Sequence, residues 1–174
     1  MKTQRVSMRV DRVTLEGDDS FAPIEPVWWT ADIYHSPAEY ESSLAAFTRA
    51  QRLFSAIHWY WSEVNNGGHY QFYDNSTGIV WRDALAGFEL LGLHDFAFVL
   101  QESAGRLGGQ PPLDREERLT LLERLAPEFD DLDERFYTLV EKMNLDARML
   151  EYMRQHADEF KFEGIVEKPV FPEK

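Results

Sequence analysis

The sequence contains no cysteine among its 174 residues. Disulfides, thiolate metal ligands and cysteine nucleophiles are therefore excluded as a basis for folding or catalysis. No run of 18 apolar residues occurs, and residues 1–9 contain no apolar stretch of the kind that directs secretion. These absences predict a soluble cytoplasmic protein that makes no direct contact with a membrane.

Basic residues are scarce relative to acidic ones. The chain carries 31 Asp and Glu against 18 Lys and Arg, which gives a formal net charge of −13 at pH 7. A charge of this size repels nucleic acids and anionic membranes at long range, so we expect no direct binding to either. A basic protein would complement this charge, although acidity also serves solubility alone.

The common motifs of metal, nucleotide and hydrolase sites are also missing. The sequence has no His-Glu-x-x-His, no Gly-x-Ser-x-Gly elbow, and no glycine loop followed by Lys and Ser or Thr. His58 and Glu63 are five residues apart, a spacing that does not place two ligands on one helical face. His35, His94 and His156 have no second histidine three or four residues away. No metal or other cofactor is expected.

Apolar and aromatic residues are abundant, at 44% and 14% of the chain. A chain of this length can bury about 70% of its unfolded surface, so we expect a single domain over residues 1–174. The helical spacing of the apolar residues predicts a mainly α fold, a bundle of about six to seven helices. In this prediction residues 1–35 form a strand and arm packed on the domain, residues 36–160 form the helical body, and residues 161–174 form a C-terminal tail.

Capping signals place most of the expected helices. A box at Ser36-Pro37-Ala38-Glu39 opens a long or broken helix that should end at Asn66-Gly67-Gly68, and further helices are expected at about 79–91, at 95–107, and from Asp114, Asp131 and Asp146. Alternation of Val6, Met8 and Val10, followed by a shift to Val13 and Leu15, predicts a strand with a bulge. Residues 17–35 read as an irregular arm. The tail alternates briefly and could pair with the N-terminal strand.

One segment, from Glu63 to Gly78, interrupts the helical pattern with amides, glycines and aromatics. It reads Glu-Val-Asn-Asn-Gly-Gly, then Gln-Phe, then Asn-Ser and Gly. This signature resembles that of a mostly bacterial family long described as a domain of unknown function, and the resemblance covers about residues 36–160. The residues that carry it are Glu63, Asn65, Asn66, Gly67, Gly68, Gln71, Phe72, Asn75 and Gly78.

The resemblance implies a helical fold and suggests a kind of partner. One member of the family is an acidic DNA mimic, described as dimeric, whose surface carboxylates stand in for phosphates on the DNA-binding surface of a transcription factor. The resemblance therefore implies a non-enzymatic, acidic protein-binding module. Its partner would be a basic protein such as a DNA-binding regulator, and a homodimer is left open.

The signature itself allows two interpretations. Asn-Gly-Gly tolerates positive φ angles, and Gln71 and Asn75 lie four residues apart on one helical face, so the segment can be a polar network that braces a turn. Amides are poor acids and bases, which favours this interpretation. The alternative is a small-ligand binder or enzyme that uses Glu63, His69, Gln71 and Asn75 in a pocket lined by Trp61, Tyr70 and Phe72. A toxin-neutralising or stress-related accessory protein is a third class, supported by acidity alone.

The acidic residues are unevenly distributed. Seven acids and no Lys or Arg stand between Arg12 and Arg49, a charge that we expect to be hard to neutralise locally. In the C-terminal part, the pairs Asp114 with Arg118, Asp131 with Arg135, and Arg154 with Asp158 are spaced to neutralise one another on helices.

A second group of acids, Asp130, Asp133, Glu134 and Glu141, has no Lys or Arg three or four residues away. Asp130, Glu134 and Glu141 recur at helical spacing, so their carboxylates could form a row that resembles the phosphates of DNA. The candidate partner-binding acids are Glu16, Asp18, Asp19, Glu25, Asp32, Glu39, Glu41, Asp130, Asp133, Glu134 and Glu141.

Overall fold

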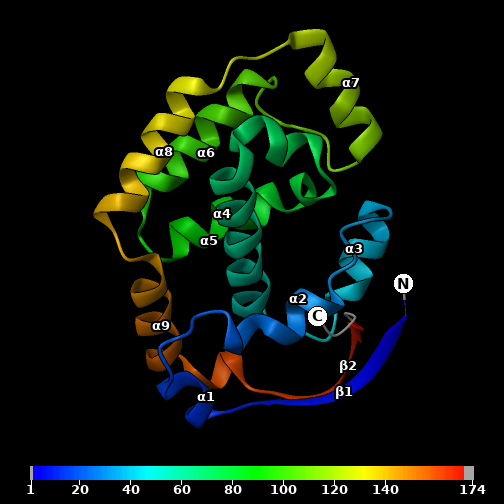
Figure 1. Cartoon of the computed structure of the whole chain (residues 1–174), viewed down its shortest axis with the longest axis vertical. Coiled ribbons are helices and arrows are strands. Elements are labelled where there is room, and N and C mark those ends of the chain that lie inside the picture. Colours follow the sequence, from blue (N-terminus) through cyan, green and yellow to red (C-terminus); the bar gives the residue numbers. More distant parts are fainter. Residues whose placement is uncertain (1, 171–174) are drawn as a thin grey trace.

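The computed structural model describes residues 2–170 of the chain. In this part, two strands, β1 (Thr3–Val10) and β2 (Phe162–Pro169), pair as an antiparallel ribbon, and nine α-helices lie between them in the sequence. The longest helix, α4 (Arg49–Asp74), runs through the middle of the molecule, and the ribbon curves around one end (Figure 1). The mainly α fold with paired terminal segments is confirmed.

Helix α4 begins with a capping box and supplies the centre of the core. Thr48 Oγ1 accepts from Gln51 N, and the Gln51 side chain accepts from Thr48 N. Tyr60 is fully buried, and three aromatic rings meet its ring edge to face at 5.1–5.6 Å between centroids: Phe72, Phe88 and Phe136. This arrangement explains why the apolar face of α4 is covered by helices on several sides.

The expectation that the helical run stops at Asn66-Gly67-Gly68 is confirmed in that Gly67 and Gly68 leave helical geometry, but α4 resumes beyond this kink and continues to Asp74. Gly68 adopts φ 74°, a conformation that favours glycine. Beyond the kink, His69 N donates to Asp133 Oδ1 at 2.9 Å. The carboxylate comes from α8 (Asp130–Lys142) and supplies an acceptor where the non-helical backbone interrupts the helical ladder, so a helix can restart.

The N-terminal segment is more helical than expected. Val13 and Leu15 lie in α1 (Arg12–Glu16), not in a bulged strand, because the Asp11 carboxylate caps a helix by accepting from the backbone N–H groups of Val13 and Thr14. The arm contains a 3₁₀ helix, Ala22–Ile24, and α2 (Glu25–Thr30), each with proline in its first turn. Helices α1 and α2 bring the number within residues 2–170 to nine, above the six to seven predicted.

The other helices follow the predicted signals closely. They are α3 (Pro37–Ser43), α5 (Trp81–Leu90), α6 (His94–Arg106), α7 (Arg115–Leu125) and α9 (Leu145–Gln155), with 3₁₀ helices at Ser76–Val80 and Ala157–Phe160. Ser36 and Asp114 cap their helices as predicted. The predicted starts of α8 and α9 are one residue late, since α8 begins at Asp130 and Asn144 caps α9.

The ribbon pairs without interruption from Thr3 opposite Pro169 to Val10 opposite Phe162. Val10 and Val166 lie on its inner face and are buried, whereas the side chains of the other face are exposed. Within residues 2–170, every helix is too short or too polar to cross a membrane.

Candidate functional site

The first polar group of the signature is centred on Glu63 of α4. Glu63 Oε2 accepts from Gln71 Nε2 at 2.8 Å and from Asn75 Nδ2 at 2.9 Å. Glu63 precedes the kink and both amides follow it, so one carboxylate ties the two halves of the helix together. A side chain at Gly67 would overlap that of Gln71, which explains the glycine at this position.

The second polar group is centred on His69, which is fully buried. Its Nδ1 lies 2.5 Å from Asp133 Oδ1, and its Nε2 lies 2.7 Å from the Tyr60 hydroxyl. Since the carboxylate only accepts, Nδ1 donates to Asp133, and in the tautomer that carries its proton on Nδ1 the Nε2 atom accepts from Tyr60. Burial raises the pKa of Tyr60, so its hydroxyl keeps its proton.

The order Tyr60, His69, Asp133 is that of a proton relay, but its inner members are closed to solvent. Tyr60 and His69 have no exposed surface. The imidazole packs against Phe129 and Phe136, with ring centroids 5.8 and 6.2 Å away. The hydrogen bonds of Tyr60, His69 and Asp133 therefore join α4 to α8, and the surrounding side chains shield them from water.

A third group, built on Arg118 of α7, has no counterpart in the sequence-based predictions. The side chain is fully buried and donates to two backbone carbonyls of α4 and its C-terminal end, Tyr73 O at 2.7 Å and Asn75 O at 2.8 Å. It also donates to Pro112 O and Leu113 O, both at 3.0 Å. Burial lowers its pKa to about 10, so it remains charged at pH 7.

The structure also explains why residue 78 is glycine. A Cβ at Gly78 would lie 2.5 Å from Arg118 Nε and 2.8 Å from Phe72 O. The predicted pair of Asp114 with Arg118 is wrong, because the Asp114 carboxylate accepts from Glu117 N and caps α7 while the guanidinium turns inward. An arginine four residues after an aspartate reads as a surface pair, so no signal in the sequence pointed to this burial.

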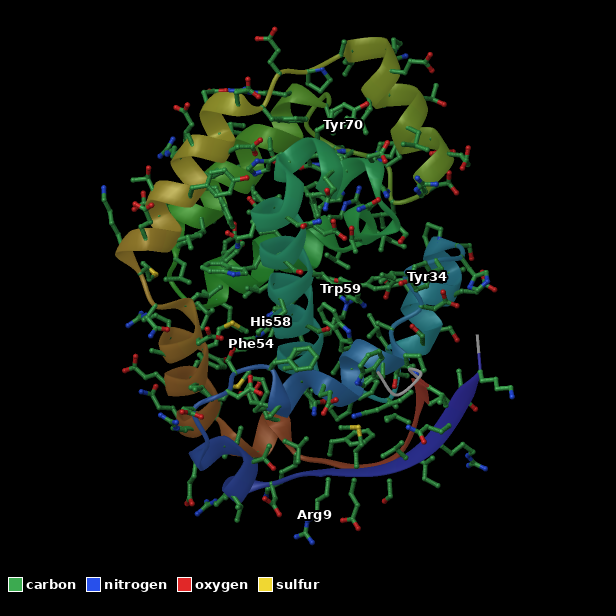
Figure 2. All side chains as sticks on the ribbon, viewed as in Figure 1. Arg9, Tyr34, Phe54, His58, Trp59 and Tyr70 are labelled. Atoms are coloured by element: carbon green, nitrogen blue, oxygen red, sulfur yellow. The ribbon has the colours of Figure 1, made fainter. Side chains whose placement is uncertain are left out.

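Other members of the signature lie apart from these groups. Asn65 and Asn66 are exposed, and Asn65 Nδ2 donates to Trp61 O at 2.9 Å, so Asn65 does not turn inward. Tyr70 is 52% exposed near the kinked end of α4, whereas Phe72 is fully buried (Figure 2). The residues of the ligand-binding alternative are thus divided: Glu63 joins Gln71 and Asn75, and His69 joins Asp133. Of its three rings, Tyr70 is exposed, Phe72 is buried, and Trp61 packs against the rings of Phe96 and Phe136.

The remaining histidines of the described residues belong to no cluster of metal-ligating side chains. Within residues 2–170, no group of three or more His, Asp or Glu side chains is arranged to hold a metal. His58 Nε2 lies 3.0 Å from Ser20 Oγ, which also donates to Asp146. This contact fastens the N-terminal arm to α4 and α9. Burial lowers the pKa of His58, so its ring is neutral at pH 7.

Several candidate partner-binding acids are already engaged. Asp133 holds His69, as described, and Asp32 lies 2.8 Å from His35 Nδ1. Glu25 pairs with Lys168 at 2.5 Å, and Glu41 pairs with Arg52 at 2.5 Å. The segment between Arg12 and Arg49 is thus partly neutralised from outside, because Lys168 and Arg52 pair with Glu25 and Glu41, while Asp32 lies beside His35 of the same segment.

The other two predicted helical ion pairs are also absent from the described structure. Asp131 pairs with Arg106 of α6 at 2.5 Å, which leaves Arg135 to lie over the Phe98 ring at 4.5 Å. Arg154 donates to Leu15 O and Gly17 O, while Asp158 pairs with Lys161. Spacing along one helix could not reveal these competing partners on neighbouring elements.

Seven of the candidate acids form no ion pair within residues 2–170: Glu16, Asp18, Asp19, Glu39, Asp130, Glu134 and Glu141. Glu39 is committed to its helix cap, where Oε2 accepts from Ser36 N at 3.0 Å. The other six are exposed. Three of them, Asp130, Glu134 and Glu141, lie on one face of α8, at about 6 and 10 Å intervals along the helix axis.

Comparison with known proteins gave one match. A family profile described as DMP19-like protein matches residues 45–156, which include the whole signature and α8 but neither strand of the ribbon. No curated protein and no solved structure matched. Because the profile covers more than half of the 174 residues, the chain belongs to the DMP19-like protein family.

Proposed function

We propose that the protein is a non-enzymatic binding module and that the exposed carboxylates of α8 receive a basic protein. The observation that carries the proposal is that the carboxylates of Asp130, Glu134 and Glu141 are exposed and form no ion pair with any described residue. They share one helix face within the region that matches the family. The candidate acids before residue 45 lie outside that region, and three of them are paired internally.

The signature has an architectural role in this proposal. Asp133 of α8 accepts from His69 at the kink, and Tyr137 Oη donates to Val64 O at 3.0 Å, so α8 is attached to both halves of α4. Asp133 points inward to these contacts while Asp130 and Glu134 stay exposed. A carboxylate row on a helix that is held at fixed points loses little freedom when a partner binds.

Electrostatics defines the class of partner. Exposed charges attract over roughly 10 Å at 0.1 M salt, so a row of uncompensated carboxylates on a chain of charge −13 steers basic surfaces toward it. A regulator's DNA-binding surface is basic and already shaped for a row of anions. We therefore propose a DNA-binding regulator as the partner, with the protein occupying the place of DNA.

Competition with duplex DNA tests this function. Regulators retained from the native lysate on the immobilised protein at about 50 mM salt would be purified, and each would be bound to a fluorescent operator duplex. We expect the protein to displace the duplex at low salt and to lose this ability by about 200 mM salt, as phosphate contacts do. A regulator that binds protein and DNA together would contradict mimicry, and salt-insensitive binding would contradict the electrostatic basis.

A further inference from the structure

A surface cavity of about 370 Å³ lies between α1 and the end of α9. Helix α1 contributes Arg12, Leu15 and Glu16, and the other side is formed by Arg154 of α9 and by Ala157. Figure 1 shows α1 beside this end of α9. Positions 12, 15 and 16 share one helical face, so α1 presents two charged side chains and one apolar side chain to the same cavity. Its volume lies within the range of sites that bind small molecules.

Arg154 is held in a fixed position at this cavity. Its Nε donates to Leu15 O at 2.8 Å, and its Nη2 donates to Gly17 O at 2.7 Å. A guanidinium has five N–H donors, so three of them have no partner among the described residues. Because the two backbone contacts already restrict the side chain, little freedom is lost when the remaining donors receive an anion.

Arg12 and Glu16 also keep their charges free. They are four residues apart on α1, yet neither forms an ion pair within residues 2–170, and both are exposed. Two arginines and one glutamate give the lining an excess of one positive charge, in a chain whose net charge is −13. The cavity therefore attracts an anionic group and also offers a carboxylate to a cationic one.

The rest of the lining is apolar. Leu15 is 2% exposed, Ala157 is half-buried, and the aliphatic stems of arginine side chains extend such a surface. We propose that the cavity binds a free α-amino acid with an apolar side chain. The carboxylate of the ligand accepts from Arg12 and Arg154, and its ammonium group donates to Glu16. Its side chain packs against Leu15 and Ala157.

Other small anions fit this lining less well. A phosphate ester brings a second negative charge close to the Glu16 carboxylate, and a simple carboxylate leaves Glu16 without a cation. The acids of α8 do not line the cavity, so the proposal is independent of the proposed function. Arg12, Leu15, Glu16 and Ala157 also lie outside residues 45–156, so membership of the family does not by itself predict this site.

Isothermal titration calorimetry with three probes tests the class of ligand. Leucine carries an ammonium group, a carboxylate and an apolar side chain, whereas isocaproate lacks the ammonium group and isoamylamine lacks the carboxylate. We expect leucine to bind saturably at millimolar concentration and at least about ten-fold more tightly than either analogue, because each analogue leaves a charged group of the cavity unpaired. Absence of saturable binding by leucine, or equal affinity for leucine and either analogue, would overturn the proposal.

Substitutions test which residue contacts which group of the ligand. Arg12→Met should weaken leucine binding at least about ten-fold and leave isoamylamine binding unchanged, whereas Glu16→Gln should weaken leucine binding and leave isocaproate binding unchanged. Arg5→Met and Glu116→Gln are the matched controls, because they remove the same charges from exposed residues that do not line the cavity. Circular dichroism checks that each variant is folded. Equal effects of a variant and its control, or the same loss for all three probes, would overturn the proposal.

Discussion

Replacement of Arg118 by Met is expected to destabilise the protein severely, although this arginine touches no carboxylate within the described residues. The change removes the hydrogen bonds that the guanidinium donates to the carbonyls of Tyr73, Asn75, Pro112 and Leu113. The Tyr73 carbonyl is left in a buried position, at a cost of about 1–3 kcal/mol, and the three partly buried carbonyls can recover some water, so each adds about 0.5–1 kcal/mol. These contributions add up to about 2.5–6 kcal/mol.

Thermal unfolding followed by circular dichroism measures this loss. For a chain of this size each kcal/mol lowers Tm by about 2–4 °C, so Arg118→Met should lower Tm by about 5–24 °C. Arg124→Met is the matched control, because Arg124 is exposed on the same helix and its replacement should change stability by less than about 0.5 kcal/mol. Equal Tm values for the two variants would refute the assignment of Arg118 as the brace between α7 and the end of α4.

Three further changes test separate parts of the structure. Asp133→Ala removes the acceptor of two N–H donors of a buried histidine and should cost about 2–4 kcal/mol in urea unfolding, whereas an acid used only for partner binding would cost almost nothing. Gly68→Ala forces a side chain into φ 74° and against a carboxylate, and should cost at least about 2 kcal/mol, while Gly105→Ala in the last turn of α6, where nothing lies within contact of the added Cβ, should slightly stabilise the protein. The hydrogen bond from Arg106 lowers the pKa of Asp131 to about 2, so the stability from this pair is fully present above the unfolded-state pKa of about 3.9 and is lost as the pH falls through 2. An NMR titration should show this low pKa in the wild type and a value near 3.9 in Arg106→Gln.

The helical body could be predicted from sequence because its signals are local. Ser36 and Asp114 cap helices through residues three positions ahead, and these contacts need no tertiary partner. The interruption at Gly68 follows from the local Asn-Gly-Gly sequence, but the contact that lets α4 resume beyond it could not be predicted in the same way, because the acceptor is Asp133, far away in the sequence. Helix α1 was missed for a different reason. The alternating apolar residues at Val13 and Leu15 favour a strand, whereas the Asp11 cap favours a helical turn.

The contacts of the signature could be predicted only in part. The shared face of Gln71 and Asn75 follows from their spacing, and both amides meet on Glu63. The burial of Arg118 and His69 depends on which helices approach them, and spacing within one helix carries no such information. For the acids, local spacing suggested the wrong ion pairs, because Arg106 and Lys168 reach carboxylates across the fold.

The central claim is that the free carboxylates of α8 receive a basic partner. Its most direct test is the affinity of a retained regulator for the triple variant Asp130→Asn, Glu134→Gln, Glu141→Gln. A control with the same change of charge neutralises exposed acids of α5 and α7, at Glu89, Glu116 and Glu123.

Fluorescence anisotropy with a labelled regulator gives both dissociation constants and their dependence on salt. We predict that the α8 variant binds at least ten-fold more weakly, a loss of about 1.4 kcal/mol, and has a shallower salt dependence, while the control stays within about three-fold of the wild type. Equal weakening of both variants would show that only net charge matters, and unchanged binding by the α8 variant would contradict the account.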